Sequence, residues 1–154
     1  MAKKILYVDM DGVLVNFRSA LPHVPDDLIE DYDGHLDDIP GIYSLMDPMP
    51  GALVAFAELA ALFDTYILST SPWENPSSWS DKLCWVKAYL GKPAYKRLIL
   101  SHHKDLNRGD FLIDDRKKHG AGRFGGEHIQ FGTKKYPDWP AVMAHLRPLA
   151  VQQV

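Results

Sequence analysis

The sequence has little of what marks a secreted, membrane-bound or polyanion-binding protein. It contains one cysteine, Cys84, so no disulfide can form within the chain. No run approaches the roughly 20 apolar residues of a membrane-spanning helix, and the apolar run near the N-terminus is too short for a signal peptide. The net charge of −3 implies no basic patch for nucleic acid. We therefore expect a cytoplasmic protein without a membrane or a nucleic-acid polymer as partner.

What the sequence does have is the size and composition of a globular domain. Its 154 residues are 46% hydrophobic and 24% charged, which is ordinary for a folded protein. That length leaves little room for a second domain, so residues 1–154 are expected to form one. The oligomeric state is not fixed by the sequence, and a homodimer is compatible with it.

Short apolar runs alternate along the chain with segments of helical periodicity. Strands are predicted at residues 5–8, 65–68, 97–100, 111–113 and 128–131. Helices are predicted over residues 51–63, 79–90 and 139–146. In the second helix, one apolar face is formed by Trp79, Leu83, Val86 and Leu90. This alternation predicts a three-layer, Rossmann-like α/β fold, with helices on both faces of a parallel sheet of about five strands.

Residues 14–49 differ in composition from the rest of the chain. They contain four prolines and an acidic cluster that runs from Asp26 to Asp38. Such a segment predicts an irregular insertion with at most short helices. We expect it to form a small cap on the α/β domain.

Polar side chains follow three of the predicted strands at their carboxyl ends, where ligands bind in parallel sheets. These are Asp9, Thr70 and the pair Asp114-Asp115. Asp11, two residues after Asp9, can face the same side, and Gly12 allows a sharp turn there.

Carboxylates gathered in this way need a cation or protonation to be stable. Oxygen ligands without a supporting cysteine suit Mg²⁺. One aspartate could attack a phosphorus atom while a second moves a proton to or from the reacting oxygens. Thr70, Ser71 and Lys104 offer hydroxyl groups and a positive charge for a phosphate.

Each motif alone has an ordinary explanation. Many loops contain Asp-x-Asp, Ser-Thr-Ser-Pro is typical of turns, and an Asp-Asp pair often caps a helix. The ordered set is far more specific. The segment Asp9-Met10-Asp11-Gly12-Val13, Thr70, Lys104 and Asp114-Asp115 resemble, in this order, the four motifs of the haloacid-dehalogenase-like (HAD) phosphatases. The resemblance is closer still to the 5′(3′)-deoxyribonucleotidases, through residues 67–72, 98–104 and 112–116. It covers nearly the whole chain apart from residues 18–45 and the tail.

This resemblance implies a Mg²⁺-dependent phosphatase that acts on nucleoside monophosphates through an aspartyl-phosphate. It implies Asp9 as nucleophile and Asp11 as general acid and base, with Thr70, Ser71 and Lys104 at the phosphate and Phe17 near the nucleobase. The Mg²⁺ ligands would be the Asp9 side chain, the Asp11 carbonyl and one of the pair Asp114-Asp115. Of that pair, Asp115 is favoured as the direct ligand, with the reverse order left open.

Two questions stay open at this point. Trp73 follows the phosphate-loop candidate, and stacking on a base and simple packing are about equally expected. The insertion is shorter than in animal relatives of that family, which leaves the nucleotide specificity open. The alternatives are a phosphatase for another small ester such as a sugar phosphate, and a catalytically idle module that binds a nucleotide or a metal.

Overall fold

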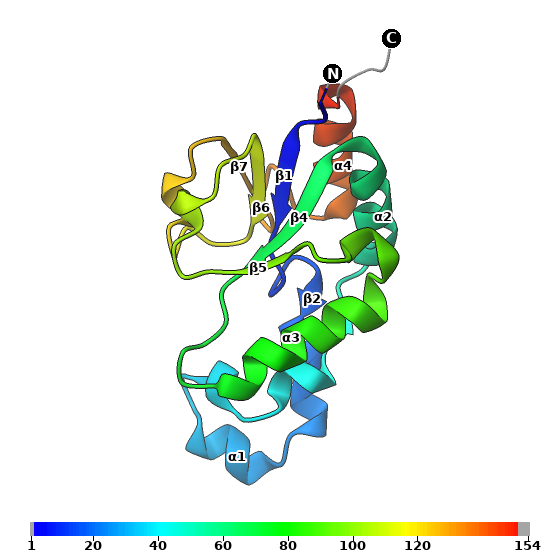
Figure 1. Ribbon diagram of the computed structural model, residues 1–154. Helices are drawn as coiled ribbons and strands as arrows, with labels where there is room; N and C mark the ends of the chain where they lie inside the picture. The colour runs from blue at the N-terminus through cyan, green and yellow to red at the C-terminus, as the bar shows by residue number, and fades with distance from the viewer. Residues whose placement is uncertain (1, 151–154) are drawn as a thin grey trace.

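A five-stranded parallel sheet forms the centre of the computed structural model, which describes residues 2–150 (Figure 1). In spatial order the strands are β5 (Leu98–Leu100), β4 (Asp64–Ser69), β1 (Ile5–Val8), β6 (Phe111–Asp114) and β7 (Glu127–Gln130). All five predicted strands are confirmed, with ends that differ by at most one residue. The central strand, β1, is an almost wholly apolar run because both of its faces are covered.

The two faces of the sheet are covered differently. Side chains of β1, β4 and β6 pack in one large core with α2 (Ala52–Leu62), α3 (Pro76–Tyr89) and α4 (Trp139–Leu146). The other face packs against Ala121 and Phe124. Its outer layer consists of short 3₁₀ helices, η5 (Lys104–Leu106) and η6 (Ala121–Arg123). The α/β fold is confirmed, but the connections 101–110 and 115–126 are near the minimum length of a helical crossover, so this layer is thin.

The inward face of helix α3 matches only in part the one its apolar residues predict, since Val86 and Leu90 are buried but Trp79 is half-buried. It begins at Pro76, and its buried residues are Ser78, Lys82, Trp85 and Val86. Leu83 is 44% exposed, so its expected place in the core is wrong. The apolar pattern misleads because α3 packs against the insertion as well as the sheet, and the buried side of the helix includes a lysine.

The insertion leaves the α/β unit through β2 (Val15–Asn16) and returns through the antiparallel β3 (Asp47–Pro48). The Met49 N–H donates to the Leu14 carbonyl at 2.8 Å and closes this neck. Only short elements lie between the two strands: η1 (Phe17–His23), α1 (Asp26–Asp31), η2 (Leu36–Asp38) and η3 (Ile42–Leu45). Figure 1 shows the segment at the end of the molecule opposite the termini.

Side chains of α3 and the residue before it attach the insertion to the rest of the molecule. Three of them reach its backbone: the Asn75 amide donates to the carbonyls of Asp37 (2.9 Å) and Ile39 (3.0 Å), Ser77 Oγ accepts from the Gly41 N–H (3.0 Å), and the Trp85 indole donates to the Met46 carbonyl (3.0 Å). Because Asn75 and Trp85 are buried, these bonds hold the insertion firmly against α3.

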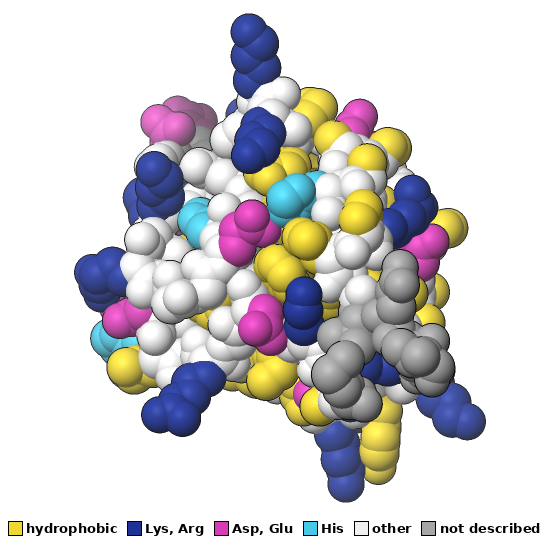
Figure 2. Space-filling model, turned by 90° about the horizontal axis from the view of Figure 1, so that it is seen from above, with side chains coloured by type: hydrophobic (Ala, Val, Ile, Leu, Met, Phe, Trp, Pro, Cys, Tyr) yellow, Lys and Arg dark blue, Asp and Glu magenta, His cyan; other side chains and the backbone are white. Residues whose placement is uncertain are grey.

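Figure 2 views the end of the molecule that carries the termini, where most of the Lys and Arg side chains drawn stand around the edge and are interspersed with acidic and apolar ones. Within residues 2–150, no helix has the length and apolar character needed to cross a membrane.

Candidate active site

The strand register brings the candidate side chains to one edge of the sheet. Val8 pairs with Ile113 of β6 and with Ile67 of β4, and the Asp9 N–H donates to the Ile113 carbonyl at 2.9 Å. Asp9 therefore lies beside Asp114, at the carboxyl ends of three neighbouring strands. A cleft of about 860 Å³ opens between this edge and the insertion. All the site residues expected from the sequence line it: Asp9, Asp11, Phe17, Thr70, Ser71, Trp73, Lys104, Asp114 and Asp115.

The turn after β1 aims Asp9 and Asp11 into this cleft. The Met10 carbonyl accepts hydrogen bonds from the backbone N–H groups of residues 13–15, which curls the chain tightly. Gly12 has φ +78°, in the left-handed region that favours glycine. A Cβ atom at Gly12 would also collide with the Asp115 carboxylate. Glycine is therefore required here for two independent reasons.

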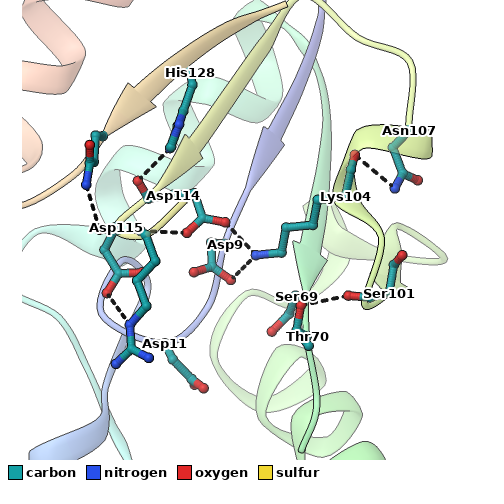
Figure 3. Close-up of polar contacts among 12 residues, drawn as sticks. Asp9, Asp11, Ser69, Thr70, Ser101, Lys104, Asn107, Asp114, Asp115 and His128 are labelled. Atoms are coloured by element: carbon teal, nitrogen blue, oxygen red, sulfur yellow. Dashed lines mark hydrogen bonds and ion pairs between the residues drawn. The ribbon is translucent and has the colours of Figure 1, made fainter. Parts of the chain in front are cut away.

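Lys104 lies between two of the carboxylates (Figure 3). Its buried Nζ donates to Asp9 Oδ1 at 3.1 Å and to Asp114 Oδ2 at 2.5 Å. Burial disfavours its charged form, but the charges of Asp9 and Asp114 outweigh burial and raise the pKa of Lys104. Its ammonium group stays protonated and neutralises part of the acidic cluster.

Asp9, Asp114 and Asp115 can each offer one carboxylate oxygen such that all three lie within 4.8 Å of one another. Burial raises the pKa of Asp9. Burial, followed by the charges of Asp9 and Asp114, raises the pKa of Asp115 to about 7. Such shifts mark a site that is short of positive charge.

The loop that carries Asp114 and Asp115 is supported by its neighbours. Asp114 Oδ1 accepts from the Arg116 N–H at 2.9 Å, so both of its oxygens have protein partners. From β7, His128 Nε2 lies 3.1 Å from the Asp114 carbonyl, and the Gln130 amide donates to the Asp115 carbonyl at 3.3 Å (Figure 3). The Asp115 carboxylate makes fewer contacts with the protein than that of Asp114, and the nearest cationic group, the Arg116 guanidinium, is 3.9 Å away.

Two residues that were not expected from the sequence contact the Asp11 carboxylate. The Tyr43 hydroxyl, from η3 of the insertion, donates to Asp11 Oδ2 at 2.9 Å. The fully buried Lys82, from α3, has its Nζ 3.7 Å from the same oxygen. Burial raises the pKa of Asp11, and it lowers the pKa of Lys82. Burial and the charge of Asp11 raise the pKa of Tyr43. Its hydroxyl group therefore stays protonated and remains the donor of this hydrogen bond.

A signal for Lys82 exists in the sequence, but none does for Tyr43. Lys82 lies four residues after Ser78 and three before Trp85, on one helical face. Because tryptophan often faces the core, a lysine on the same helical face as Trp85 could have been expected to face inward as well. Tyr43 lies in an irregular segment, where no periodicity reports which way a side chain points.

The two hydroxyl groups expected at a phosphate differ in their partners. The Thr70 hydroxyl donates to the Ser101 carbonyl at 2.7 Å, so its proton is already engaged (Figure 3). Ser71 Oγ is buried and has no hydrogen-bond partner in the described part of the chain. A buried hydroxyl without a partner is costly, and an anion in the cleft would satisfy it.

The two aromatic candidates lie on different parts of the cleft wall. Phe17 is partly buried, with its ring edge-to-face with Tyr43 at 5.9 Å between centroids. Trp73 is 75% exposed, and its ring lies 6.5 Å from Trp79 and 5.9 Å from His102. Most of the Trp73 ring is therefore open to a ligand.

Comparison with known proteins gives consistent matches. The profile of the family described as 5′ nucleotidase, deoxy (pyrimidine), cytosolic type C protein (NT5C) matches residues 34–137. A Vibrio phage KVP40 protein named 5′(3′)-deoxyribonucleotidase is 57% identical over 144 residues, covering 94% of this chain and 85% of that protein. The human 5′(3′)-deoxyribonucleotidase of cytosolic type is 32% identical over 149 residues, covering 75% of this chain and 73% of that protein.

A solved structure extends the likeness to the fold. The HAD-hydrolase YfnB from Bacillus subtilis, solved bound to magnesium, superimposes with a TM-score of 0.66 at 12% identity. The match covers 96% of this chain and 100% of that chain. At this identity the comparison supports the HAD-like fold and nothing finer.

Proposed function

Because the chain belongs to the 5′(3′)-deoxyribonucleotidase family of phosphatases, we propose that it hydrolyses deoxyribonucleoside monophosphates with the help of Mg²⁺. The observation that carries the proposal is the set of charges at the sheet edge. Four carboxylates, from Asp9, Asp11, Asp114 and Asp115, face two ammonium groups, from Lys82 and Lys104. With all six groups charged, two negative charges are left over, which one divalent cation would balance, and protonation of Asp11 would leave one.

The donor set fits Mg²⁺, which prefers hard oxygen ligands. The Asp9 and Asp115 side chains and the Asp11 backbone carbonyl would hold it. Asp114 would support the site, since its two oxygens already bind Lys104 and the Arg116 N–H. Bound there, Mg²⁺ would screen the repulsion between the Asp9 carboxylate and the anionic phosphate.

The chain's own residues then account for two chemical steps. An Asp9 oxygen attacks phosphorus, the bond to the ester oxygen breaks, and Asp11 gives its proton to that oxygen. The nucleoside leaves, and an aspartyl-phosphate remains on Asp9. Water then attacks phosphorus and gives a proton to Asp11, and inorganic phosphate leaves as Asp9 is regenerated. Burial raises the pKa of Asp11 and so favours the protonated form that the first step needs.

The remaining candidates would bind the substrate. Lys104 supplies a positive charge to the phosphate, and Ser71 a hydroxyl with no competing partner within residues 2–150. Thr70 would contribute by releasing its bond to Ser101. Phe17 and Trp73 would contact the base, with residues 14–49 acting as the cap over it. A cytoplasmic location and a homodimer remain predictions from the sequence.

The test is a panel of phosphate esters, assayed with Mg²⁺ and with a chelator. Deoxyribonucleoside monophosphates should be hydrolysed fastest, and only with the metal present. Equal or faster hydrolysis of sugar phosphates would overturn the nucleotide assignment. No hydrolysis of any ester, with nucleotide and Mg²⁺ binding intact, would favour a catalytically idle module.

A substitution of Asp9 tests its role as the nucleophile. Asp9→Asn should remove turnover, and acid-quenched protein should retain labelled phosphate in the wild type but not in the variant. Asp27→Asn, at an exposed aspartate of α1, is the matched control and should behave as the wild type. Full activity of Asp9→Asn would contradict the assignment.

A further inference from the structure

The two oxygens of the Asp11 carboxylate have different surroundings. Oδ2 accepts from the Tyr43 hydroxyl at 2.9 Å and lies 3.7 Å from Lys82 Nζ. Oδ1 is buried and has no hydrogen-bond partner in residues 2–150. The protein therefore holds the carboxylate through Oδ2 alone, and rotation of the group is restrained at that one oxygen.

The two groups that hold Oδ2 are themselves fixed. Lys82 Nζ donates to Ser69 Oγ at 2.8 Å and to the Thr70 carbonyl at 2.6 Å, at the end of β4. The same Nζ lies 4.8 Å from the centre of the Tyr43 ring, within reach of a cation–π interaction. Tyr43 is buried as well. The pair therefore links β4, α3 and the insertion around Asp11 Oδ2.

We propose that Tyr43 and Lys82 are positioning residues that fix the rotation of the Asp11 carboxyl group, and with it the direction in which the group offers its proton to the oxygen that leaves phosphorus. The inference rests on the proposed function, in which Asp11 protonates that oxygen. Proton transfer requires the acid to lie within hydrogen-bond distance of its target. A carboxyl group whose rotation is restrained keeps that geometry, whereas a freely rotating one adopts it only part of the time.

This arrangement gives the insertion a part in catalysis. Tyr43 belongs to η3, so a residue of the insertion aims the acid in addition to any contact of the insertion with the substrate. The competing explanation is that Tyr43 and Asp11 serve only to satisfy the buried charge of Lys82. The two explanations differ in how the effect of a variant depends on the leaving group.

The decisive variant is Tyr43→Phe, which removes one oxygen atom and keeps the ring. The substrates are dinitrophenyl, nitrophenyl and phenyl phosphate, assayed with Mg²⁺. A dinitrophenolate leaves without needing a proton, whereas phenolate departs readily only when protonated. We expect kcat/KM, which reports the step in which the leaving group departs, to fall about tenfold to a hundredfold on phenyl phosphate and much less on dinitrophenyl phosphate.

Matched controls separate this effect from a general loss of structure. Tyr95→Phe removes a hydroxyl from an exposed tyrosine outside the cleft and should leave all three rates unchanged. Lys82→Met should show the same leaving-group dependence as Tyr43→Phe, with Lys87→Met on the exposed side of α3 as its control. Thermal denaturation checks that each variant folds, and if Lys82→Met does not, Tyr43→Phe alone decides.

The outcomes distinguish the two levels of the proposal. If Tyr43→Phe lowers the rate equally for all leaving groups, or does not lower it, the positioning role is overturned. Hydrolysis by the wild type would still support the proposed function in that case. Wild-type protein that hydrolyses none of the esters would overturn the proposed function and the positioning role with it. A loss that grows as the leaving group worsens would support both.

Discussion

Gly12 and Asp115 lie next to each other in the wall of the cleft. A Cβ atom added to Gly12 would stand 2.9 Å from Asp115 Cγ and closer still to its Oδ2. Real Cβ atoms do not approach other atoms this closely, so one of the two residues must move when Gly12 is replaced. The contact joins the turn that carries the proposed nucleophile to the loop that carries the proposed metal ligand.

Gly12→Ala should therefore weaken Mg²⁺ activation as well as stability. Its φ of +78° is strained for alanine by about 1 kcal/mol or more, and the Cβ atom displaces Asp115. Mg²⁺ titration of phosphatase activity measures the effect. Gly41→Ala is the matched control, because Gly41 has φ +80° with no atom within 4 Å of an added Cβ. The same Mg²⁺ requirement in both variants would contradict the contact's role.

The metal-free protein should lose stability as pH rises. Burial and the charges of Asp9 and Asp114 raise the pKa of Asp115 to about 7, against roughly 3.9 in an unfolded chain. Between these values the folded state binds more protons than the unfolded state, so the free energy of unfolding falls as pH increases. Melting temperatures in a chelator, from about pH 5 to about pH 7.5, should show the decline.

Mg²⁺ should raise the melting temperature most at the upper end of this range, where the carboxylates are ionised. Asp115→Asn should flatten the decline in the chelator without removing it, because burial also raises the pKa values of Asp9 and Asp11. Identical pH profiles for wild type and variant would show that Asp115 does not titrate as expected.

Asn75→Ala should loosen the insertion. Its buried amide donates to the carbonyls of Asp37 and Ile39, and the variant leaves both without that donor. The Ile39 carbonyl keeps a hydrogen bond from the Ile42 N–H at 3.2 Å, and Asp37 is exposed. The cost is therefore that of two lost hydrogen bonds, and we expect unfolding to become easier by about 1–3 kcal/mol. Urea denaturation measures this. Asn107→Ala is the control, since the Asn107 amide makes only long contacts, of 3.4 and 3.5 Å, and a comparable loss there would argue against the special role of Asn75.

Phe17→Ala and Trp73→Ala should affect nucleotides more than small esters. Both rings line the cleft, and stacking on a base contributes about 1–3 kcal/mol, or roughly tenfold or more in KM. KM for a deoxyribonucleoside monophosphate should rise, while KM for glycerol phosphate, which has no base, should stay the same. A parallel rise for both substrates would indicate that the rings shape the cleft without binding the base.

Much of the fold could be predicted because its strands are encoded locally. Each strand of the sheet is a short apolar run, and Asp9, Thr70 and Asp114 come at or directly after strand ends, so their convergence follows from parallel topology alone. What could not be predicted is the environment of Asp11. Tyr43 and Lys82 reach it from segments 32 and 71 residues away, in an irregular insertion and on a helix face that the apolar pattern assigned to solvent.

The hydrogen bonds from Asn75, Ser77 and Trp85 reach the insertion only through its main chain. These three residues bind backbone carbonyl and N–H groups of residues 37–46. Every amino acid has a backbone carbonyl, and every one except proline has a backbone N–H, so these bonds do not depend on which side chains the insertion carries. Side chains of the insertion that face the cleft can therefore be exchanged without removing the bonds that seat it. Apart from Tyr43 and core side chains such as Ile42 and Met46, the insertion can be diversified to recognise new phosphate esters while the carboxylates beneath it stay in place.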